Sequence, residues 1–586
     1  MKLIKRLFYI FPCKQRWQFA GLFLLQLIET LLDFFGVSLI LPFVNVLVNA
    51  DALRGAGWYG MVSRLIGADD TASILLFITL LMIAVYIVKN IFILFLLNLR
   101  VRFIGTNKVK MGAKMIDCYM HKPYTFHLQR NTAEIIRNIN GDVGGAFSVI
   151  SNIFSLISDI LIVIALVVYL FAVEFAMTLG VMLALAACSA VYFLFVRKKI
   201  RTVGQENRKV TARMYKAIQQ AMGGIKEVKV MGREKYFAEV YNEAGIESVR
   251  LSKRYSVISA IPGRLIETLC MCTILGILAL KIATGQELSS VVPSLSAFAV
   301  AAIRLLPRAN SINSCINSIT YNMPSLEALY DDLTESDREE AERLREAEEK
   351  KRQKKTVSIG AEQDIFVRGV TYTYPNKTEP VLKNVSLRVE HGSSVGIVGV
   401  TGAGKTTLVD LILGLLKPDS GTICYGTLDI HEDYAQWQKH IGYIPQAIYL
   451  VDDTIRSNVA LGVNAEQIDD AAVWRALENA QLADFVRTLE DGLDTVIGER
   501  GIRISGGQRQ RIGIARALYY DPEILFFDEA TSSLDNETEA AVMESVNALG
   551  SQKTMIIVAH RLTTLRGCDK IYRVDEAGVE ETRLEI

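Results

Sequence analysis

The sequence of 586 residues lacks the paired cysteines and clustered histidines that would indicate a disulfide-rich or zinc-binding protein. Its eight cysteines are scattered without a CxxC pair, and its six histidines show no ligand spacing, so we expect reduced structural thiols. The formal net charge of +1 carries no information about nucleic-acid binding, and we expect no nucleic acid as a partner. No internal repeat is visible, which argues against an array or solenoid.

What the sequence has in excess is apolar residues, which make up 51% of the chain. They are concentrated between residues 17 and 310, whereas the sequence after about 357 has the composition of an ordinary soluble domain. The N-terminal MKLIKRLFYIFPCKQRWQF is followed by an apolar run too long for a signal peptide and without a cleavage site, so it predicts a short interfacial helix.

Hydropathy predicts six membrane-spanning helices, each long enough to cross a hydrocarbon core about 30 Å thick. Their predicted ranges are 17–42, 72–99, 147–171, 175–196, 256–283 and 288–310. Lysines and arginines precede the first span and follow the second and fourth, so the positive-inside rule assigns these ends to the cytosol.

The connections between the spans agree with this topology. The charged segments 100–146 and 197–255 are expected to be cytosolic, and the longest outer segment, DALRGAGWYGMVSRLIG, is interpreted as an interfacial helix or a plain loop. The mixed-charge run at 331–355 predicts a solvated helical linker. We therefore expect a membrane domain over 1–330, a charged helical linker over 331–356 and a soluble domain over 357–586.

The soluble domain contains the phosphate-binding pattern G-x-x-x-x-G-K-[ST] in GVTGAGKTT, between a predicted strand and a predicted helix. Its glycines allow backbone N–H groups to point at phosphates, Lys405 can reach the terminal phosphates and Thr406 can ligate Mg²⁺. The candidate ATP-binding residues here are Gly399, Thr401, Gly402, Ala403, Gly404, Lys405, Thr406 and Thr407.

Two further segments strengthen this interpretation. EILFFDEATSSLD predicts a buried strand that ends in Asp528, a candidate Mg²⁺ ligand, and Glu529, a candidate base for the attacking water. ISGGQRQRIGIARAL predicts an amphipathic helix whose start could bind a second anion. The candidate residues of that second site are Ser505, Gly506, Gly507 and Gln508. Two phosphate sites with one phosphate loop suggest that two copies enclose ATP between them.

These motifs, in this order, resemble the nucleotide-binding domain of ATP-binding cassette (ABC) proteins over nearly all of 360–586. The resemblance implies that ISGGQ is the signature sequence with Ile504 in place of leucine, and that TVIGERG is the cross-talking loop of exporters. It further implies that Gln446 is the glutamine that contributes to ATP and Mg²⁺ binding, that Ser532–Asp535 form the D-loop, and that His560 contacts the γ-phosphate. Tyr374 resembles the aromatic residue that stacks on adenine.

A cassette fused behind six spans resembles the type IV ABC exporter. The expected fold is therefore an α-helical membrane domain followed by an α/β P-loop domain, with ATP and Mg²⁺ as cofactors. The segments 123–142 and 223–237 resemble the two regions that carry coupling helices. One cassette per chain implies a homodimer, with a heterodimer as the alternative. The expected location is the bacterial inner (plasma) membrane, with the cassette in the cytosol.

Four of the cations within the predicted spans are candidates for a substrate cavity, since charges there usually face a cavity or pair with one another. They are Lys89, Arg264, Arg304 and Arg308. From a rise of about 1.5 Å per residue, all four are expected in the cytosolic half of the membrane. They either line a cationic cavity for an anionic substrate or form local ion pairs with Glu29, Asp33, Asp159 or Glu267.

A cationic cavity would suit a lipid that carries phosphate or pyrophosphate. The segments LIETLLDFFGVSLILPFV, AIPGRLIETL and SAFAVAAIRLLPRANSI resemble PglK-like flippases of lipid-linked oligosaccharides, although Lys89, Arg264 and Arg308 depart from that pattern. The alternatives are a general lipid, drug or peptide exporter, a soluble cassette ATPase and an importer. The six fused spans disfavour the last two.

Overall fold

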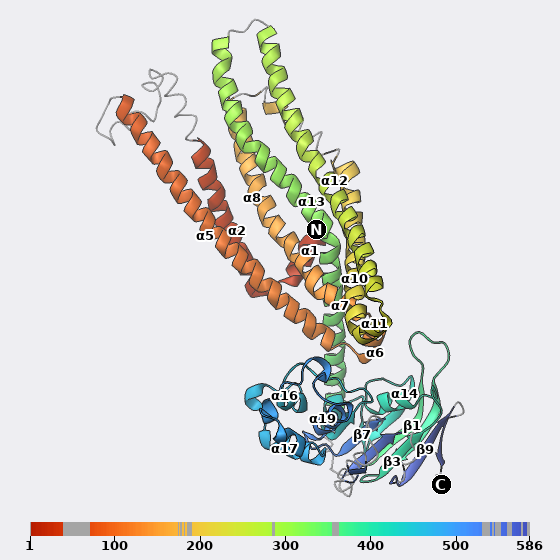
Figure 1. Ribbon diagram of the computed structural model, residues 1–586. Coiled ribbons are helices and arrows are strands. Elements are labelled where there is room, and N and C mark those ends of the chain that lie inside the picture. Colours follow the sequence, from red (N-terminus) through yellow and green to blue (C-terminus); the bar gives the residue numbers. More distant parts are fainter. Residues whose placement is uncertain are drawn as a thin grey trace. The chain divides into compact units, whose positions relative to one another are not determined.

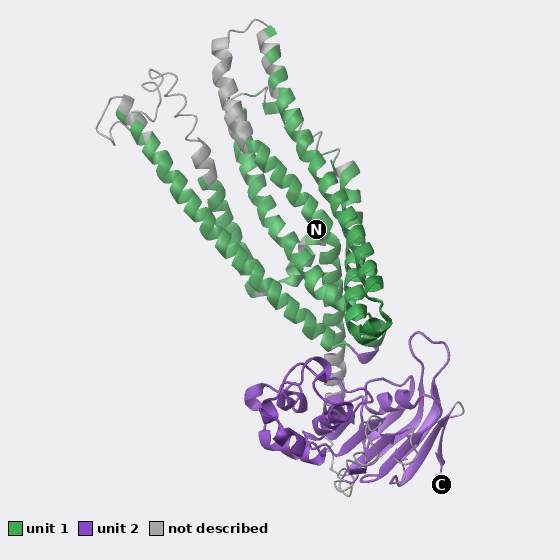
Figure 2. Ribbon diagram, in the orientation of Figure 1, with its two compact units in different colours: residues 1–122, 126–342 green, residues 123–125, 343–586 purple. Residues whose placement is uncertain are grey.

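The computed structural model describes most of the chain, and all structural statements below concern the described residues. These are residues 2–38, 71–173, 175, 178–180, 182–183, 190, 192–283, 288–353, 363–529, 540–541, 544, 553–559, 565, 567–575 and 578–582. They divide into two compact units, one of residues 1–122 and 126–342, the other of residues 123–125 and 343–586 (Figure 2). The domain boundaries expected from the sequence, 330/331 and 356/357, remain predictions.

The first unit consists of helices, several of them very long (Figure 1). They are α1 (Lys2–Ile10), α2 (Cys13–Ser38), α5 (Thr71–Met120), α6 (Tyr124–Gln129), α7 (Thr132–Arg137), α8 (Val143–Val173), α10 (Arg197–Gly223), α11 (Ile225–Met231), α12 (Glu234–Ala283) and α13 (Leu288–Gln353). Short π-helices, η2 (Asn138–Asp142) and η3 (Tyr192–Val196), lead into α8 and α10. The predicted short N-terminal helix is confirmed as α1.

The predicted membrane spans fall on these helices wherever the structure describes them. Two stretches among the described residues, Thr79–Met120 and Thr132–Val168, are long and apolar enough to cross a membrane. Residues 256–283 lie in α12 and 288–310 in α13. Ten of the 22 residues of the predicted fourth span, and all of the outer segment DALRGAGWYGMVSRLIG, lie outside the described residues. The count of six spans therefore stays a prediction.

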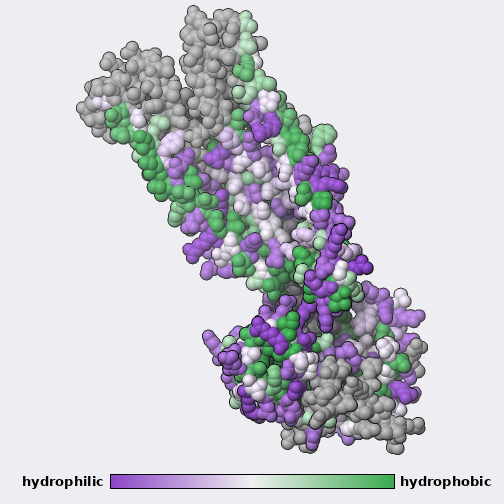
Figure 3. All heavy atoms as spheres, in the orientation of Figure 1, coloured by the Kyte–Doolittle hydropathy of each residue, from purple (hydrophilic) through white to green (hydrophobic). Residues whose placement is uncertain are grey.

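A buried apolar cluster joins the N-terminal helices to α5, α8 and α13. Phe11, which directly follows α1, contacts the rings of Phe19, Phe103 and Phe147, and Leu326 is fully buried in the same cluster. Much of the apolar surface of α5 is instead exposed, including Leu80, Ile87, Ile91 and Leu94. Figure 3 shows this hydrophobic surface along α5, as expected for a helix that contacts lipid.

The segment 331–353 is helical, as predicted, and forms the last part of α13. Its beginning packs on α5: Leu333 is buried, Tyr119 donates a hydrogen bond to Asp332 over 2.7 Å, and the buried Lys122 pairs with Glu339 at 2.9 Å. The sequence pattern missed this packing because the partners of these carboxylates lie more than 200 positions earlier.

The second unit contains two sheets. The antiparallel sheet has the order β2-β1-β4-β5, and the larger sheet has the order β10-β9-β3-β8-β7-β6. Strands β9, β3, β8, β7 and β6 are mutually parallel, and β10 pairs with β9 in the antiparallel sense. The strands are β1 (Ile365–Tyr372), β2 (Leu382–Val389), β3 (Ser394–Val398), β4 (Ser420–Tyr425), β5 (Leu428–Asp429), β6 (Ile441–Ile444), β7 (Ile524–Asp528), β8 (Thr554–Val558), β9 (Lys570–Asp575) and β10 (Gly578–Thr582).

The larger sheet separates two apolar cores, because alternate residues of β7 and β8 face opposite sides, and helices cover both of its faces. The first core packs α14 (Lys405–Ile412) and α15 (Tyr434–His440) against both sheets around the fully buried Trp437. The second core packs α16 (Ile455–Val459), α17 (Asp470–Asn479), α18 (Ala483–Thr488) and α19 (Gly506–Leu518) on β6, β7 and β8. Strands β7 and β8 are buried along their whole length, as expected for parallel strands covered on both faces.

Candidate functional site

The candidate ATP site lies at the carboxyl ends of the parallel strands of the larger sheet. Strand β3 leads into the glycine-rich loop, β7 ends at Asp528, and β6 ends two residues before Gln446. Because parallel strands point the same way, these three segments meet at one edge, which is where open α/β sheets bind ligands. The order β3-β8-β7-β6 thus brings together motifs that are more than 120 residues apart in the sequence.

The loop between β3 and α14, residues 399–404, has the backbone conformation of a phosphate-binding loop, and we call it the phosphate cradle. Gly402 and Gly404 adopt φ values of 87° and 98°, which side chains disfavour. A Cβ atom at Gly399 would lie 2.3 Å from the carbonyl oxygen of Val574, so the backbone there tolerates no side chain. The spacing of the motif is therefore required by the geometry of this loop.

Lys405 begins α14 and keeps its ammonium within the loop. The residue is 7% exposed, and its Nζ donates hydrogen bonds to the carbonyl oxygens of Gly399 (2.8 Å) and Val400 (3.2 Å). Thr406 and Thr407 follow in the first turn of α14, Thr406 exposed and Thr407 buried. A buried cation, a glycine-rich backbone and a helix N-terminus make this cradle suited to a polyphosphate.

Two acidic residues belong to elements that adjoin the phosphate cradle: Asp528 ends β7, and Asp410 lies in α14. Asp528 is 7% exposed and accepts a hydrogen bond from the Tyr443 hydroxyl over 3.3 Å. Burial, with the charge of Glu529 adding to it, raises the pKa of Asp528, while Lys405 opposes the shift. Burial and the charge of Asp528 also raise the pKa of Asp410 to about 6. A buried carboxylate with one hydroxyl partner has the donor chemistry that Mg²⁺ prefers.

Glu529 is held beside Gln446. The side-chain amide of Gln446 donates to Oε2 of Glu529 over 2.5 Å, and the backbone N–H of Glu529 donates to the carbonyl of Val558 over 2.9 Å. Glu529 has a positive φ of 50°, which is uncommon for a residue with a side chain and which directs the chain sharply after β7. The structure therefore brings the predicted base and the predicted glutamine into contact.

Tyr374 lies between the antiparallel sheet and the cradle. Its hydroxyl is 3.1 Å from Oγ1 of Thr407, and its ring contacts that of Tyr372 edge-on. The half-buried position beside the phosphate loop agrees with a place near the nucleotide. Stacking on adenine stays a prediction.

The signature segment caps α19 and belongs to the other core. The side chain of Ser505 accepts from the backbone N–H of Gln508, and Gln508 accepts in return from the backbone N–H of Ser505, which is a capping box. Ser505 and Gly506 are exposed, whereas α14 and the phosphate cradle pack in the first core. Figure 1 shows α14 and α19 as separate elements of the cassette. His560 and Ser532–Asp535 lie outside the described residues.

The predicted membrane cations have different surroundings. Lys89 is 6% exposed and lies 5.3 Å from the centre of the Tyr86 ring. Arg264 pairs with Glu267 at 3.0 Å, which confirms the expected local ion pair. Arg308 pairs with Asp159 at 2.9 Å, which is one of the ion-pair partners expected from the sequence. The side chain of Arg304 lies outside the described part of α13.

Sequence reasoning missed Asp410 and Tyr443, both of which act on Asp528. Asp410 lies five residues after Lys405 and Tyr443 three residues before Gln446, so both were adjacent to recognised motifs. The available signal was a polar residue inside an otherwise apolar helix or strand, LVDLIL and IGYIP.

Comparisons with known proteins agree with this geometry. The profile described as ABC transporter matches residues 382–532, and that described as ABC transporter transmembrane region matches 19–300. The ATP-dependent lipid A-core flippase of Cupriavidus pinatubonensis is 30% identical over 81% of this chain and 78% of its own length. The protein of that name from Escherichia coli K12 is 27% identical over 81% of this chain and 80% of its own length.

A solved structure supports the fold. It is described as a bacterial Atm1-family ABC exporter with ATP bound, superimposes with a TM-score of 0.75, and covers 97% of this chain and 94% of the solved one at 22% identity. The expected type IV exporter fold is therefore confirmed. With both regions matched, the chain belongs to the ABC transporters, as an integral membrane protein of the exporter type that binds and hydrolyses ATP.

Proposed function

We propose that this ABC exporter is a flippase that uses ATP to move a phosphorylated glycolipid from the inner to the outer leaflet. The observation that carries the proposal is the 30% identity, over 81% of the chain, to a protein named for flipping lipid A-core. Within this class, a polyprenyl-pyrophosphate oligosaccharide is the specific candidate, on the resemblance of the membrane segments to PglK-like proteins. Both lipids combine sugars, long apolar chains and phosphate.

The residues of the cradle suggest how ATP is bound and cleaved. Lys405 and the loop amides would hold the β- and γ-phosphates, and Thr406, Asp528 and Gln446 would hold Mg²⁺, which neutralises charge on the phosphates when bound. Glu529 would accept the proton of the attacking water, with His560 at the γ-phosphate. The contact from Gln446 supports this role because it orients the Glu529 carboxylate.

The complete site requires a second copy in this proposal. The signature helix packs in a different core from the phosphate cradle, and its capping residues Ser505 and Gly506 are exposed. We therefore propose a homodimer in which Ser505–Gln508 of one copy cover ATP bound by the other. ATP would close the two cassettes and hydrolysis would release them, biasing the membrane domain between inward- and outward-open states.

The membrane cations would recognise the anionic headgroup. The candidates are Lys89, Arg264, Arg304 and Arg308, of which Arg264 and Arg308 share their charge with Glu267 and Asp159. Burying a lysine ammonium within a membrane span costs free energy unless the charge pairs with another group, faces a cavity or binds a substrate. The proposed location is the bacterial inner membrane, with the membrane domain, linker and cassette divided as the sequence predicts.

The proposal is tested by substrate-stimulated ATP hydrolysis in lipid nanodiscs. A polyprenyl-pyrophosphate oligosaccharide and a lipid A-type phosphoglycolipid are compared with a neutral glycolipid of similar chain length. We expect stimulation by a phosphorylated glycolipid only, and its loss in Arg304→Ala with unchanged basal hydrolysis. Equal stimulation by the neutral lipid would indicate a general lipid exporter, and no stimulation by any of them would contradict the substrate class.

A further inference from the structure

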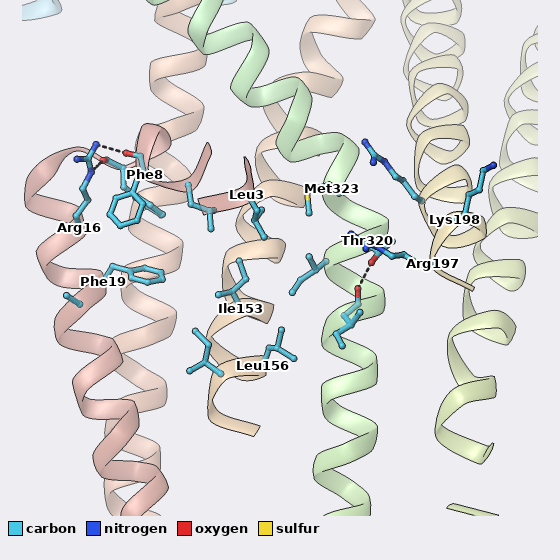
Figure 4. Close-up of a pocket in the computed structure, with 17 residues that line it drawn as sticks. Leu3, Phe8, Arg16, Phe19, Ile153, Leu156, Arg197, Lys198, Thr320 and Met323 are labelled. Atoms are coloured by element: carbon cyan, nitrogen blue, oxygen red, sulfur yellow. Dashed lines mark hydrogen bonds between the residues drawn. The ribbon is translucent and has the colours of Figure 1, made fainter. Parts of the chain in front are cut away.

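The membrane unit contains a groove that none of the four predicted cavity cations lines. Its volume is about 1020 Å³, and it lies between α1, α2, α8, α13 and the start of α10 (Figure 4). Of its 17 lining residues, 12 are apolar, four are cations and one is a threonine. Among the described residues, no acidic side chain lines it.

The apolar and the charged residues are segregated within this groove. Phe19 of α2 with Ile153 and Leu156 of α8 form part of its apolar wall. Arg16 lies at one side, and Arg197 and Lys198 lie across the groove on α10 (Figure 4). An apolar groove with cations along its edges complements a molecule with a hydrocarbon chain and an anionic head.

The positive charge along these edges is only partly neutralised. Arg201 pairs with Glu327 at 2.7 Å, but Arg6 pairs with the same carboxylate at 2.8 Å, so one negative charge faces two guanidinium groups. Arg16 donates to the backbone carbonyls of Phe8 (2.6 Å) and Phe11 (2.8 Å), which are uncharged acceptors. No ion pair is found between Lys198 and a described residue, and its side chain is exposed.

The topology places these cations at the level of lipid headgroups. Arg16 precedes the first predicted span and Arg197 follows the fourth, and both ends are assigned to the cytosolic side. The apolar lining residues Phe19 and Leu156 lie inside the predicted first and third spans. A chain in the groove would therefore lie in the hydrocarbon layer while its head reached the cations.

We propose that this groove binds an anionic phospholipid of the cytosolic leaflet, with its phosphate at Arg16, Arg197 and Lys198 and an acyl chain along Phe19, Ile153 and Leu156. Charge complementarity argues for an anionic lipid, and the long apolar floor argues against free phosphate as the occupant. The inference does not rest on the transported substrate, since a resident lipid requires only that the chain lies in a membrane. It goes beyond the proposed flippase by assigning a second lipid site.

The test is native mass spectrometry of the full-length protein in detergent, titrated with dioleoyl phosphatidic acid or with dioleoyl phosphatidylcholine. We expect tighter binding of the first phosphatidic acid than of the first phosphatidylcholine. Each cation near a lipid headgroup contributes about 1 kcal/mol, so Lys198→Gln should weaken phosphatidic acid binding about fivefold. Ala20→Phe, which fills the groove without changing charge, should weaken it as well.

A matched control lies one residue along the same helix. Lys199 is exposed like Lys198 but does not line the groove, so Lys199→Gln should leave lipid binding unchanged. An equal loss of phosphatidic acid binding in Lys198→Gln and Lys199→Gln would show that the lipid is attracted by general surface charge, and would overturn the proposed site. Equal affinity for the two lipids in the native protein would overturn it too. If maleimide labels a Leu156→Cys variant only after the oligomer dissociates, the groove is covered by a second copy instead.

Discussion

The Nε2 atom of Gln446 donates a hydrogen bond to Oε2 of Glu529, 83 residues away in the sequence, over 2.5 Å. The glutamine follows β6 and the glutamate follows β7, and these two strands are neighbours in the parallel sheet. The contact joins a proposed Mg²⁺ ligand to the proposed base, so occupancy of the metal site and orientation of the base are expected to depend on each other.

Glu529→Gln should therefore abolish turnover and retain ATP binding. Removing a general base costs about 10²–10⁴-fold in rate. Steady-state ATP hydrolysis and equilibrium nucleotide binding measure the two properties separately. Glu466→Gln, the same change at an exposed residue of the cassette, is the control. Hydrolysis at the native rate in the Glu529 variant would remove this residue from the role of base.

A second prediction concerns the backbone of the phosphate cradle. Gly404 has φ 98°, and a Cβ there would lie 2.9 Å from Cδ2 of Leu382. Gly404→Ala should lower the melting temperature and weaken ATP binding, since a left-handed residue with a side chain costs about 1–2 kcal/mol. Gly462→Ala is the matched control, because its φ is 83° and its surroundings are open. It should lose some stability but bind ATP normally. Equal ATP affinity in both variants would argue against a cradle at Gly404.

The third prediction uses the raised pKa of Asp410. Its pKa of about 6 in the folded protein lies above the ordinary value of 3.8. Between these values the folded state binds more protons than the unfolded state, so this group lowers stability as the pH rises through that window. Asp410→Asn cannot ionise and should raise the apparent melting temperature more at pH 8 than at pH 5. Asp452→Asn, at an exposed position, should show no such difference. A pH-independent effect of Asp410→Asn would contradict the assigned pKa.

The fourth prediction separates structure from recognition at Arg308. The side chain of Asp159 is 5% exposed, so Arg308→Ala would leave a buried carboxylate without this partner. Losing one member of a buried pair costs about 3–5 kcal/mol, and the melting temperature in detergent should fall. Replacing both residues, as in Arg308→Met with Asp159→Leu, should recover much of the loss. If the single variant is as stable as the native protein, Arg308 is available for the substrate.

The extent to which the sequence predicted this structure differs between the two units. The phosphate loop and the helix that begins at the signature segment were predictable because each depends on residues close together in the sequence, where spacing determines geometry. The contact between Gln446 and Glu529 was not derivable from local spacing, since it depends on the order β3-β8-β7-β6. In the cassette, family resemblance supplied the roles that local pattern alone could not assign.

In the membrane unit, local sequence pattern predicted less of the structure than in the cassette. The ion pair of Arg264 and Glu267 was predictable because three residues separate them on one helix, whereas that of Arg308 and Asp159 joins two helices and was one of several choices. From the sequence, Arg16 and Arg197 indicate only which ends of the spans face the cytosol. Their shared groove depends on the packing of α1, α2, α8, α10 and α13, which hydropathy does not describe.

The most direct test of the central claim is ATP-driven movement of a phosphorylated glycolipid across proteoliposomes that contain the purified protein. The native protein should transfer the lipid between leaflets only with ATP and Mg²⁺, and Glu529→Gln should bind ATP without driving transfer. Transfer at equal rates in both proteins, or with no ATP present, would contradict an ATP-driven flippase.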